Sequence, residues 1–148
     1  MTISGSYDLD VPAERAYRLL QDPAVLAQCM PGCEELNKVG DDEYEMKMKL
    51  AVASLSGAFT GKVRLADQNP PESFRLIVEG NGKIGFMKGD GLMNISTRDA
   101  GSTVAYQGDV TVGGTIASVG QRLVETSAKM IIKRFFSKFE SIAKESAG

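Results

Sequence analysis

Histidine is absent from the 148-residue sequence, and with it the side chain that most often acts as a general acid or base. A Ser-His-Asp triad cannot be built without histidine, and no serine stands in a G-x-S-x-G motif. Asp90, Asp99 and Asp109 flank turns or take outward strand positions, where solvation explains them, and no two acidic residues form an evident acid–base pair. The sequence therefore predicts a protein that is not an enzyme and favours a binding function.

Cysteine is scarce, since Cys29 and Cys33 are the two that the sequence contains. Without histidine this C-x₃-C pair cannot complete a usual zinc site, and a redox pair would normally be spaced C-x₂-C near a βαβ unit. We interpret the two residues as small, half-buried thiols of a cytosolic protein, with a labile disulfide as the alternative. Neither a metal nor a covalently bound cofactor is expected.

Long apolar runs and concentrated positive charge are also missing. No stretch approaches the ~20 apolar residues that span a bilayer, and the residues after Met1 do not resemble a signal peptide. The net charge is −2, and no basic block outside the last segment marks a nucleic-acid site. We expect a soluble chain in which residues 1–148 form one domain around one hydrophobic core.

What the chain does contain is a series of short periodic segments. Alternation of apolar residues predicts a first strand over 2–10, and Pro12 opens a helix over 13–21. Asp22 and Pro23 begin a second short helix that runs through Ala27 and ends before Pro31-Gly32. Six further strands are predicted, at about 34–39, 44–52, 59–65, 74–78, 93–95 and 104–112, with a turn at Ser56-Gly57.

The last 34 residues, 115–148, are predicted to form one long amphipathic helix. Its inward face is expected to centre on Ile131, with Leu123 and Met130 on one flank and Ile132 and Phe136 on the other. The complete order, one strand, two short helices, six strands and a final helix, is that of an α+β protein. Because short turns join the strands, we predict a curved antiparallel sheet wrapped around the terminal helix.

Charge is unevenly divided between this helix and the rest of the chain. The helix carries +3 and the remainder −5, as counted from the sequence. A basic, aromatic-flanked helix on an acidic body suits an anionic membrane or an acidic partner, and an ordinary solvated helix back is the alternative. The residues of this candidate surface are Lys129, Lys133, Arg134 and Lys138.

One glycine-rich segment imitates a nucleotide-binding motif. Residues 80–85 match G-x-G-x-x-G, but the chain continues into residues 86–91 and another strand instead of a helix. We interpret the glycines as sites of bending and close approach in a curved sheet. Phe86 and Met87, next to Lys88, are predicted to form a loop at the rim of an interior space, or else a plain exposed turn.

The predicted interior is rich in methionine, which adapts to flat rings and isoprenoid chains because it is unbranched and polarizable. A filled core without a cavity is the alternative. The candidate ligand-binding residues, with the two rim residues included, are Met46, Met48, Phe59, Leu76, Phe86, Met87, Met93, Tyr106, Leu123, Met130 and Phe135.

Several segments together resemble a known family. They are Asp22-Pro23, residues 30–36, the glycine series through Gly89-Asp90-Gly91, and residues 108–114 with their continuation 116–123. Nearly the whole chain is similar to the carbon monoxide dehydrogenase (CoxG) subunit family, which is part of the START-type, polyketide-cyclase-like superfamily. The resemblance implies a helix-grip fold, in which a long C-terminal helix crosses a seven-stranded antiparallel sheet and leaves a hydrophobic cavity.

The same resemblance implies an accessory protein of molybdenum-containing CO dehydrogenases and related hydroxylases, connected with the membrane and the respiratory quinone pool. The first hypothesis is a carrier that binds a menaquinone-like quinone, in the cytoplasm and peripherally at the inner face of the membrane. The second is a recruitment or maturation adaptor with no ligand. The third is a cyclase-type enzyme, which the missing histidine disfavours.

Overall fold

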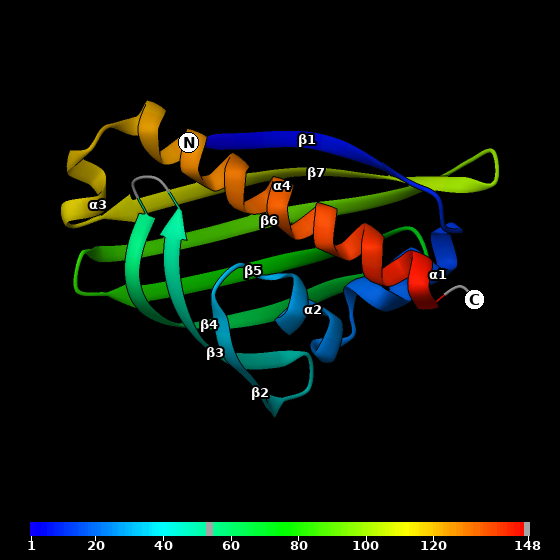
Figure 1. The fold of residues 1–148 in the computed structure, drawn as a ribbon, viewed down its shortest axis with the longest axis horizontal. Helices are drawn as coiled ribbons and strands as arrows, with labels where there is room; N and C mark the ends of the chain where they lie inside the picture. The colour runs from blue at the N-terminus through cyan, green and yellow to red at the C-terminus, as the bar shows by residue number, and fades with distance from the viewer. Residues whose placement is uncertain (53–54, 147–148) are drawn as a thin grey trace.

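The computed structural model describes residues 1–52 and 55–146. One strand and two short helices precede six strands, and two helices end the chain (Figure 1). The strands are β1 Thr2–Leu9, β2 Cys33–Gly40, β3 Glu43–Val52, β4 Leu55–Asn69, β5 Ser73–Gly82, β6 Gly85–Arg98 and β7 Gly101–Gly113. The helices are α1 Ala13–Leu20, α2 Pro23–Cys29, α3 Thr115–Ser118 and α4 Gln121–Ser146.

The strands form one antiparallel sheet in the order β1-β7-β6-β5-β4-β3-β2. Each strand from β2 to β7 pairs with the next one along the chain, and β1 closes the series by pairing with β7. Figure 1 shows α4 running diagonally across one face of this sheet, with α1 and α2 near the C-terminal end of α4. The predicted seven-stranded helix-grip fold is confirmed.

The two short helices carry the chain from β1 across to the other edge of the sheet. Pro12 precedes α1, and the Asp22 side chain accepts a hydrogen bond from the Ala24 N–H at 2.9 Å, with Pro23 in the first turn of α2. This is the capping that the sequence predicts. The second helix continues to Cys29, two residues beyond the predicted end, and α2 packs against α4.

Two strand predictions are wrong in a related way. Ser56 and Gly57, predicted as a turn, pair with Ala51 and Leu50 in the β3–β4 ladder, and residues 53–54 lie outside the described residues. The predicted rim loop is part of β6, where Met87 pairs with Val112 of β7. A ladder is made by backbone groups, so glycines within it need not interrupt the hydrogen bonds.

The terminal helix is also not continuous from Thr115, as the sequence analysis expected. The chain forms the short α3, passes through Val119 and Gly120, and then begins α4. Gly120 has φ +97°, a left-handed conformation that ends a right-handed helix and that glycine adopts without steric cost. None of the helices in the described part of the chain has the length and apolarity needed to cross a bilayer.

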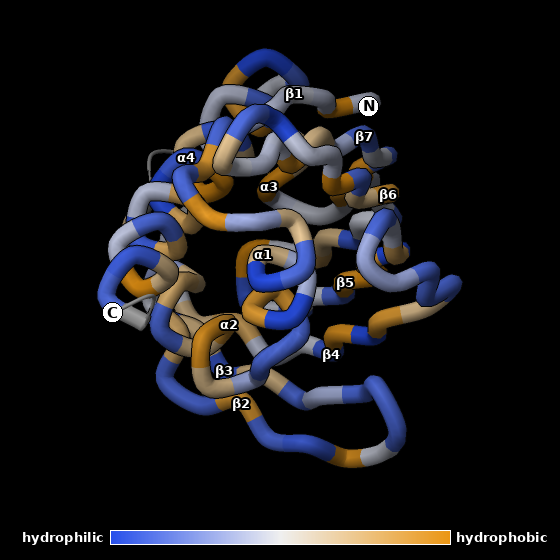
Figure 2. Tube along the Cα trace, turned by 90° about the vertical axis from the view of Figure 1, so that its right-hand side faces the viewer, coloured by the Kyte–Doolittle hydropathy of each residue, from blue (hydrophilic) through white to orange (hydrophobic). Residues whose placement is uncertain are grey.

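The core lies between the sheet and α4, as hydropathy colouring shows in the view from the α1 end (Figure 2). Phe74, Phe139, Leu9, Val104 and Val124 are almost completely buried there. The buried face of α4 is turned relative to the prediction and centres nearer Phe139 than Ile131. Met130 lies nine residues before Phe139, and nine steps of about 100° place it on the opposite side of the helix.

Candidate ligand-binding cavity

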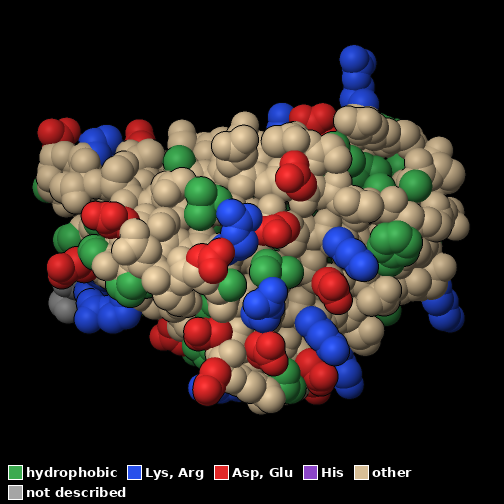
Figure 3. All heavy atoms as spheres, turned by 180° about the vertical axis from the view of Figure 1, so that it is seen from behind, with side chains coloured by type: hydrophobic (Ala, Val, Ile, Leu, Met, Phe, Trp, Pro, Cys, Tyr) green, Lys and Arg blue, Asp and Glu red, His purple; other side chains and the backbone are tan. Residues whose placement is uncertain are grey.

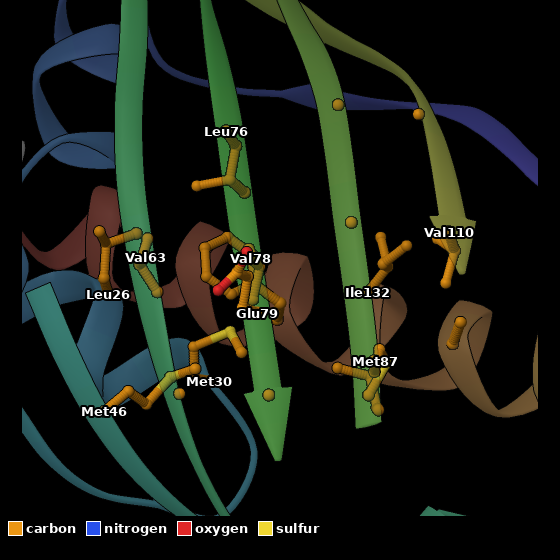
Figure 4. A pocket seen from close by; sticks show the side chains of 18 of the residues that line it. Leu26, Met30, Met46, Val63, Leu76, Val78, Glu79, Met87, Val110 and Ile132 are labelled. Carbon is orange, nitrogen blue, oxygen red and sulfur yellow. The ribbon is translucent and has the colours of Figure 1, made fainter. Parts of the chain in front are cut away.

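An apolar cavity of about 310 Å³ lies between the concave face of the sheet and α4 (Figure 4). All seven strands contribute side chains from their inward faces, and α2 and α4 close the other side. Side chains that line the cavity include Ile3, Leu26, Met30, Leu36, Met46, Val63, Leu76, Val78, Met87, Val110, Ile132 and Phe135.

The floor of the cavity is built from inward positions that carry no side chain. Gly61 pairs directly with Gly80 across β4 and β5, and Gly91 pairs with Gly108 across β6 and β7. A Cβ atom added at Gly80 or Gly89 would meet no atom within 4 Å. In a filled core these central positions would hold side chains, so the run of glycines is the direct cause of the space.

Methionines supply much of the wall around this floor. Met46 and Met48 project from β3, Met87 and Met93 from β6, and Met30 follows α2. Figure 4 shows the Met30 and Met46 side chains near one another on one side of the cavity and Met87 on the other. Flexible thioether chains can change rotamer at low cost, so the wall can adjust to the outline of a bound molecule.

An aromatic stack stands at the side where β1 and β7 approach α4. Tyr7 of β1 lies against Phe136 of α4 with ring centroids 4.5 Å apart, and against Tyr106 of β7 at 6.3 Å. Burial, followed by the neighbouring Tyr7, raises the pKa of the Tyr106 phenol above its ordinary value. The stack therefore keeps an uncharged phenol at this wall at neutral pH.

Charged side chains face away from the cavity. Glu79, Asp90 and Asp109 border it, but these residues are exposed, and strand alternation directs their side chains to the outer face. Asp90 accepts a hydrogen bond there from Arg75 at 2.7 Å. The view from behind shows Lys, Arg, Asp and Glu side chains interspersed over that outer face (Figure 3). No lysine or arginine of the described chain lines the cavity.

Eight of the eleven predicted ligand-binding residues line the cavity, whereas their role in binding stays a prediction. The eight are Met46, Met48, Phe59, Leu76, Met87, Met93, Tyr106 and Phe135. The other three lie outside it: Phe86 is 37% exposed, Met130 37% and Leu123 54%. Phe86 alternates with Met87 on β6 and so points to the opposite face, and the rotation of α4 turns Met130 and Leu123 outward.

The sequence analysis missed the glycine floor, and among the lining side chains it missed Tyr44 and Met30. The signal for the floor was present, because Gly80, Gly89 and Gly91 fall in register with the inward residues of β5 and β6. It was obscured because the segment around residues 86–91 was interpreted as a loop.

The predicted basic surface is exposed along α4. Lys129 forms an ion pair with Glu125 at 3.2 Å, one turn away on the same helix. Lys133, Arg134 and Lys138 are exposed and form no ion pair with any residue in the described ranges. Their charges are therefore available to an external partner.

The cysteines and acidic residues do not assemble a recognisable centre. Within residues 1–52 and 55–146, no three Asp, Glu, Cys or His side chains gather closely enough to hold a metal ion. Cys29 and Cys33 are both free thiols, with Cys29 buried and Cys33 partly buried. Burial raises the pKa of Cys29 to about 11, against a smaller lowering by Lys138, so its thiol is protonated and unreactive at neutral pH.

A comparison with known families now identifies the kind of protein that carries this cavity. The family model of the carbon monoxide dehydrogenase (CoxG) subunit matches residues 5–144. The chain belongs to the CoxG family. No protein with curated annotation matches this CoxG-family chain.

Solved structures support the fold of this CoxG-family protein. A conserved protein from Geobacillus kaustophilus is 29% identical, with a TM-score of 0.95 over 99% of this chain and 97% of that one. A START superfamily protein from Mycobacterium smegmatis is 11% identical, with a TM-score of 0.78 over 97% of each chain. The protein TTHA0849 from Thermus thermophilus is 14% identical, with a TM-score of 0.75 over the whole of both chains. The fold is START-like.

Proposed function

We propose that this CoxG-family protein binds a hydrophobic small molecule in the cavity between sheet and α4 and serves as an accessory protein of a CO dehydrogenase. The glycine floor is the observation that carries the proposal, because it leaves apolar space at the centre of the sheet where packing would otherwise fill it. Adaptable methionine walls and the absence of histidine further favour binding over catalysis.

The ligand that we propose is a menaquinone-like isoprenoid quinone. A volume of about 310 Å³ stands at the lower end of the range for small-molecule sites, so the ring and the first part of the tail would be enclosed. The rest of a long tail would leave through the opening. Each buried CH₂ contributes about 0.8 kcal/mol, so a few isoprene units outweigh the cost of ordering the walls.

The proposed role is to connect a molybdenum-containing dehydrogenase to the quinone pool of the membrane. The redox chemistry would belong to the quinone and the dehydrogenase, while this protein positions the ring and excludes water. Contact with the inner face of the membrane would use the exposed cations Lys133, Arg134 and Lys138.

Native mass spectrometry of protein expressed in a menaquinone-producing host tests ligand binding directly. We expect an added mass of several hundred daltons, identified as a quinone after extraction into organic solvent. Protein that remains free of ligand after incubation with excess menaquinone would contradict the proposed ligand.

A cavity-filling variant locates the binding. Gly89→Leu places a side chain in open space without backbone collision, and we expect quinone affinity to fall at least about tenfold, or about 1.4 kcal/mol. Thr111→Leu is the matched control, since Thr111 of β7 is exposed and pairs with Lys88 on the outer face. Equal loss in both variants would show that the cavity is not the binding site.

The second candidate function is a recruitment or maturation adaptor that needs no ligand. The observation that favours it is the set of cations on α4 without ion-pair partners among the described residues. Reversing Lys133, Arg134 and Lys138 to glutamate would abolish association with the dehydrogenase or with anionic vesicles under this function. Gly89→Leu would leave that association unchanged.

A further inference from the structure

Tyr44 places an unpartnered phenol at the wall of the apolar cavity. It alternates with Met46 and Met48 on the inward face of β3, lines the cavity and is 6% exposed. Its hydroxyl makes no hydrogen bond to any residue of the described chain. Tyr17, buried to a similar degree outside the cavity, shows the usual arrangement: its hydroxyl donates to the Gln68 side chain and contacts the Ser73 carbonyl oxygen at 3.2 Å.

Tyr106 presents a second hydroxyl from the opposite part of the sheet. Its ring extends over Gly5 of β1, where a Cβ atom would stand 2.6 Å from the Tyr106 hydroxyl oxygen. This hydroxyl likewise has no hydrogen-bond partner in residues 1–52 and 55–146. Because burial raises the Tyr106 pKa, the phenol remains a hydrogen-bond donor across the physiological range.

Two unpartnered donors at an otherwise apolar wall are costly unless a bound molecule accepts from them. A carbonyl, ester or ether oxygen would satisfy either hydroxyl. A carboxylate or phosphate would need more, since burying a full negative charge requires a compensating cation. The described lining supplies no lysine or arginine, and the acidic residues that border the cavity raise that cost further.

We propose that Tyr44 and Tyr106 are the specificity-determining residues of the cavity and select an uncharged lipid with oxygen acceptors over its anionic counterpart. This inference rests on the proposed function, because it assumes that the cavity binds an apolar molecule. It goes further in naming the two donors and in excluding fatty acids and anionic phospholipid headgroups as occupants of the inner cavity.

Three probes with one C15 isoprenoid skeleton test this selection. Methyl farnesoate is neutral and has ester oxygens, farnesoic acid is ionised at pH 7.5, and farnesene has no oxygen. Their affinities are measured by displacement of the neutral dye Nile red. We expect methyl farnesoate to bind at least about tenfold more tightly than farnesoic acid, and the acid to gain affinity as the pH falls below its carboxyl pKa.

Phenylalanine variants test the two donors. Tyr44→Phe and Tyr106→Phe are each expected to weaken methyl farnesoate binding by about two- to tenfold while leaving farnesene binding unchanged. Farnesene thus reports whether the cavity is still folded and open. Tyr17→Phe is the matched control, and we expect it to leave the ratio of ester to hydrocarbon affinity as it is in the unmodified protein.

The outcomes separate the inference from the proposed function. If no probe displaces Nile red and none binds in native mass spectrometry, the proposed function fails. If ester, acid and hydrocarbon bind equally well, or if both phenylalanine variants retain the full ester preference, ligand binding stands and the assignment of Tyr44 and Tyr106 is wrong.

Discussion

Glycine has two different uses in this molecule, and they can be separated residue by residue. Gly85, in the β5–β6 hairpin, has φ +134°, and an added Cβ atom would stand 2.0 Å from the Gly113 carbonyl oxygen. Gly80 has no such constraint, because its missing side chain faces the open cavity. The first glycine makes the backbone path possible, whereas the second makes space for a ligand.

Alanine at these two positions should therefore have opposite consequences. We expect Gly85→Ala to lower the free energy of unfolding by about 1–3 kcal/mol through backbone strain and collision. Gly80→Ala should leave it unchanged or raise it by up to about 1 kcal/mol, because alanine restricts the unfolded chain. Urea denaturation of both variants measures the difference, and similar losses would contradict the assigned roles.

Cys29 should make stability depend on pH in the alkaline range. Burial raises its pKa from 9.0 to about 11, so the folded state favours the neutral thiol. That contribution is fully present below pH 9 and is lost as the pH rises from about 9 to about 11. Urea denaturation should show the unmodified protein losing roughly 1–2 kcal/mol more than Cys29→Ala across this window. Parallel pH curves for the two proteins would contradict the buried thiol.

At the scale of the element, α4 shows what a periodic pattern determines and what it leaves open. The apolar arc of this segment is wide enough that several rotations bury similar numbers of large side chains. The structure selects the one that places Phe139 and Phe136 inside and Met130 outside. Contact with Tyr7 of β1 fixes Phe136 inward, and that contact joins residues far apart in sequence.

Truncating two residues of α4 tests this rotation. We expect Phe139→Ala to cost about 3–5 kcal/mol of unfolding free energy, since Phe139 is fully buried and its loss would leave a void. Met130→Ala should change stability by no more than about 0.5 kcal/mol, because its side chain is partly solvated and unconstrained. The inward face expected from the sequence, with Met130 on its flank, would give a substantial loss for both.

The elements that the sequence predicted well are those with local signals. Asp22 and Pro23 mark the start of α2, and alternation around Met46 marks β3. The errors fall where local and nonlocal information disagree. Residues 86–91 contain two glycines and directly follow a glycine, which suggests a loop, yet pairing with β5 and β7 holds them in a strand. Gly120 was not recognised as the end of a helix because apolar periodicity continues through it.

At the scale of the whole molecule, the cavity arises from the sheet and helix together. The curved sheet holds α4 away from its glycine floor, and large buried side chains such as Phe74 and Phe139 maintain the core around the gap. The presence of eight predicted lining residues followed from strand alternation, but the size of the space did not. It depends on which inward residues oppose one another, and register across several strands decides that.

The apolar walls of the cavity link ligand binding to stability. A molecule that binds the folded state alone raises the unfolding free energy by RT ln(1 + [L]/Kd), or about 2.7 kcal/mol at one hundred times Kd. We expect menaquinone to raise the thermal midpoint of the unmodified protein accordingly. Gly89→Leu should lose most of this shift while folding normally without ligand, because leucine fills apolar space that the ligand would take. Thr111→Leu should keep the full shift. An equal shift in all three proteins would mean that the ligand stabilises the fold from outside the cavity.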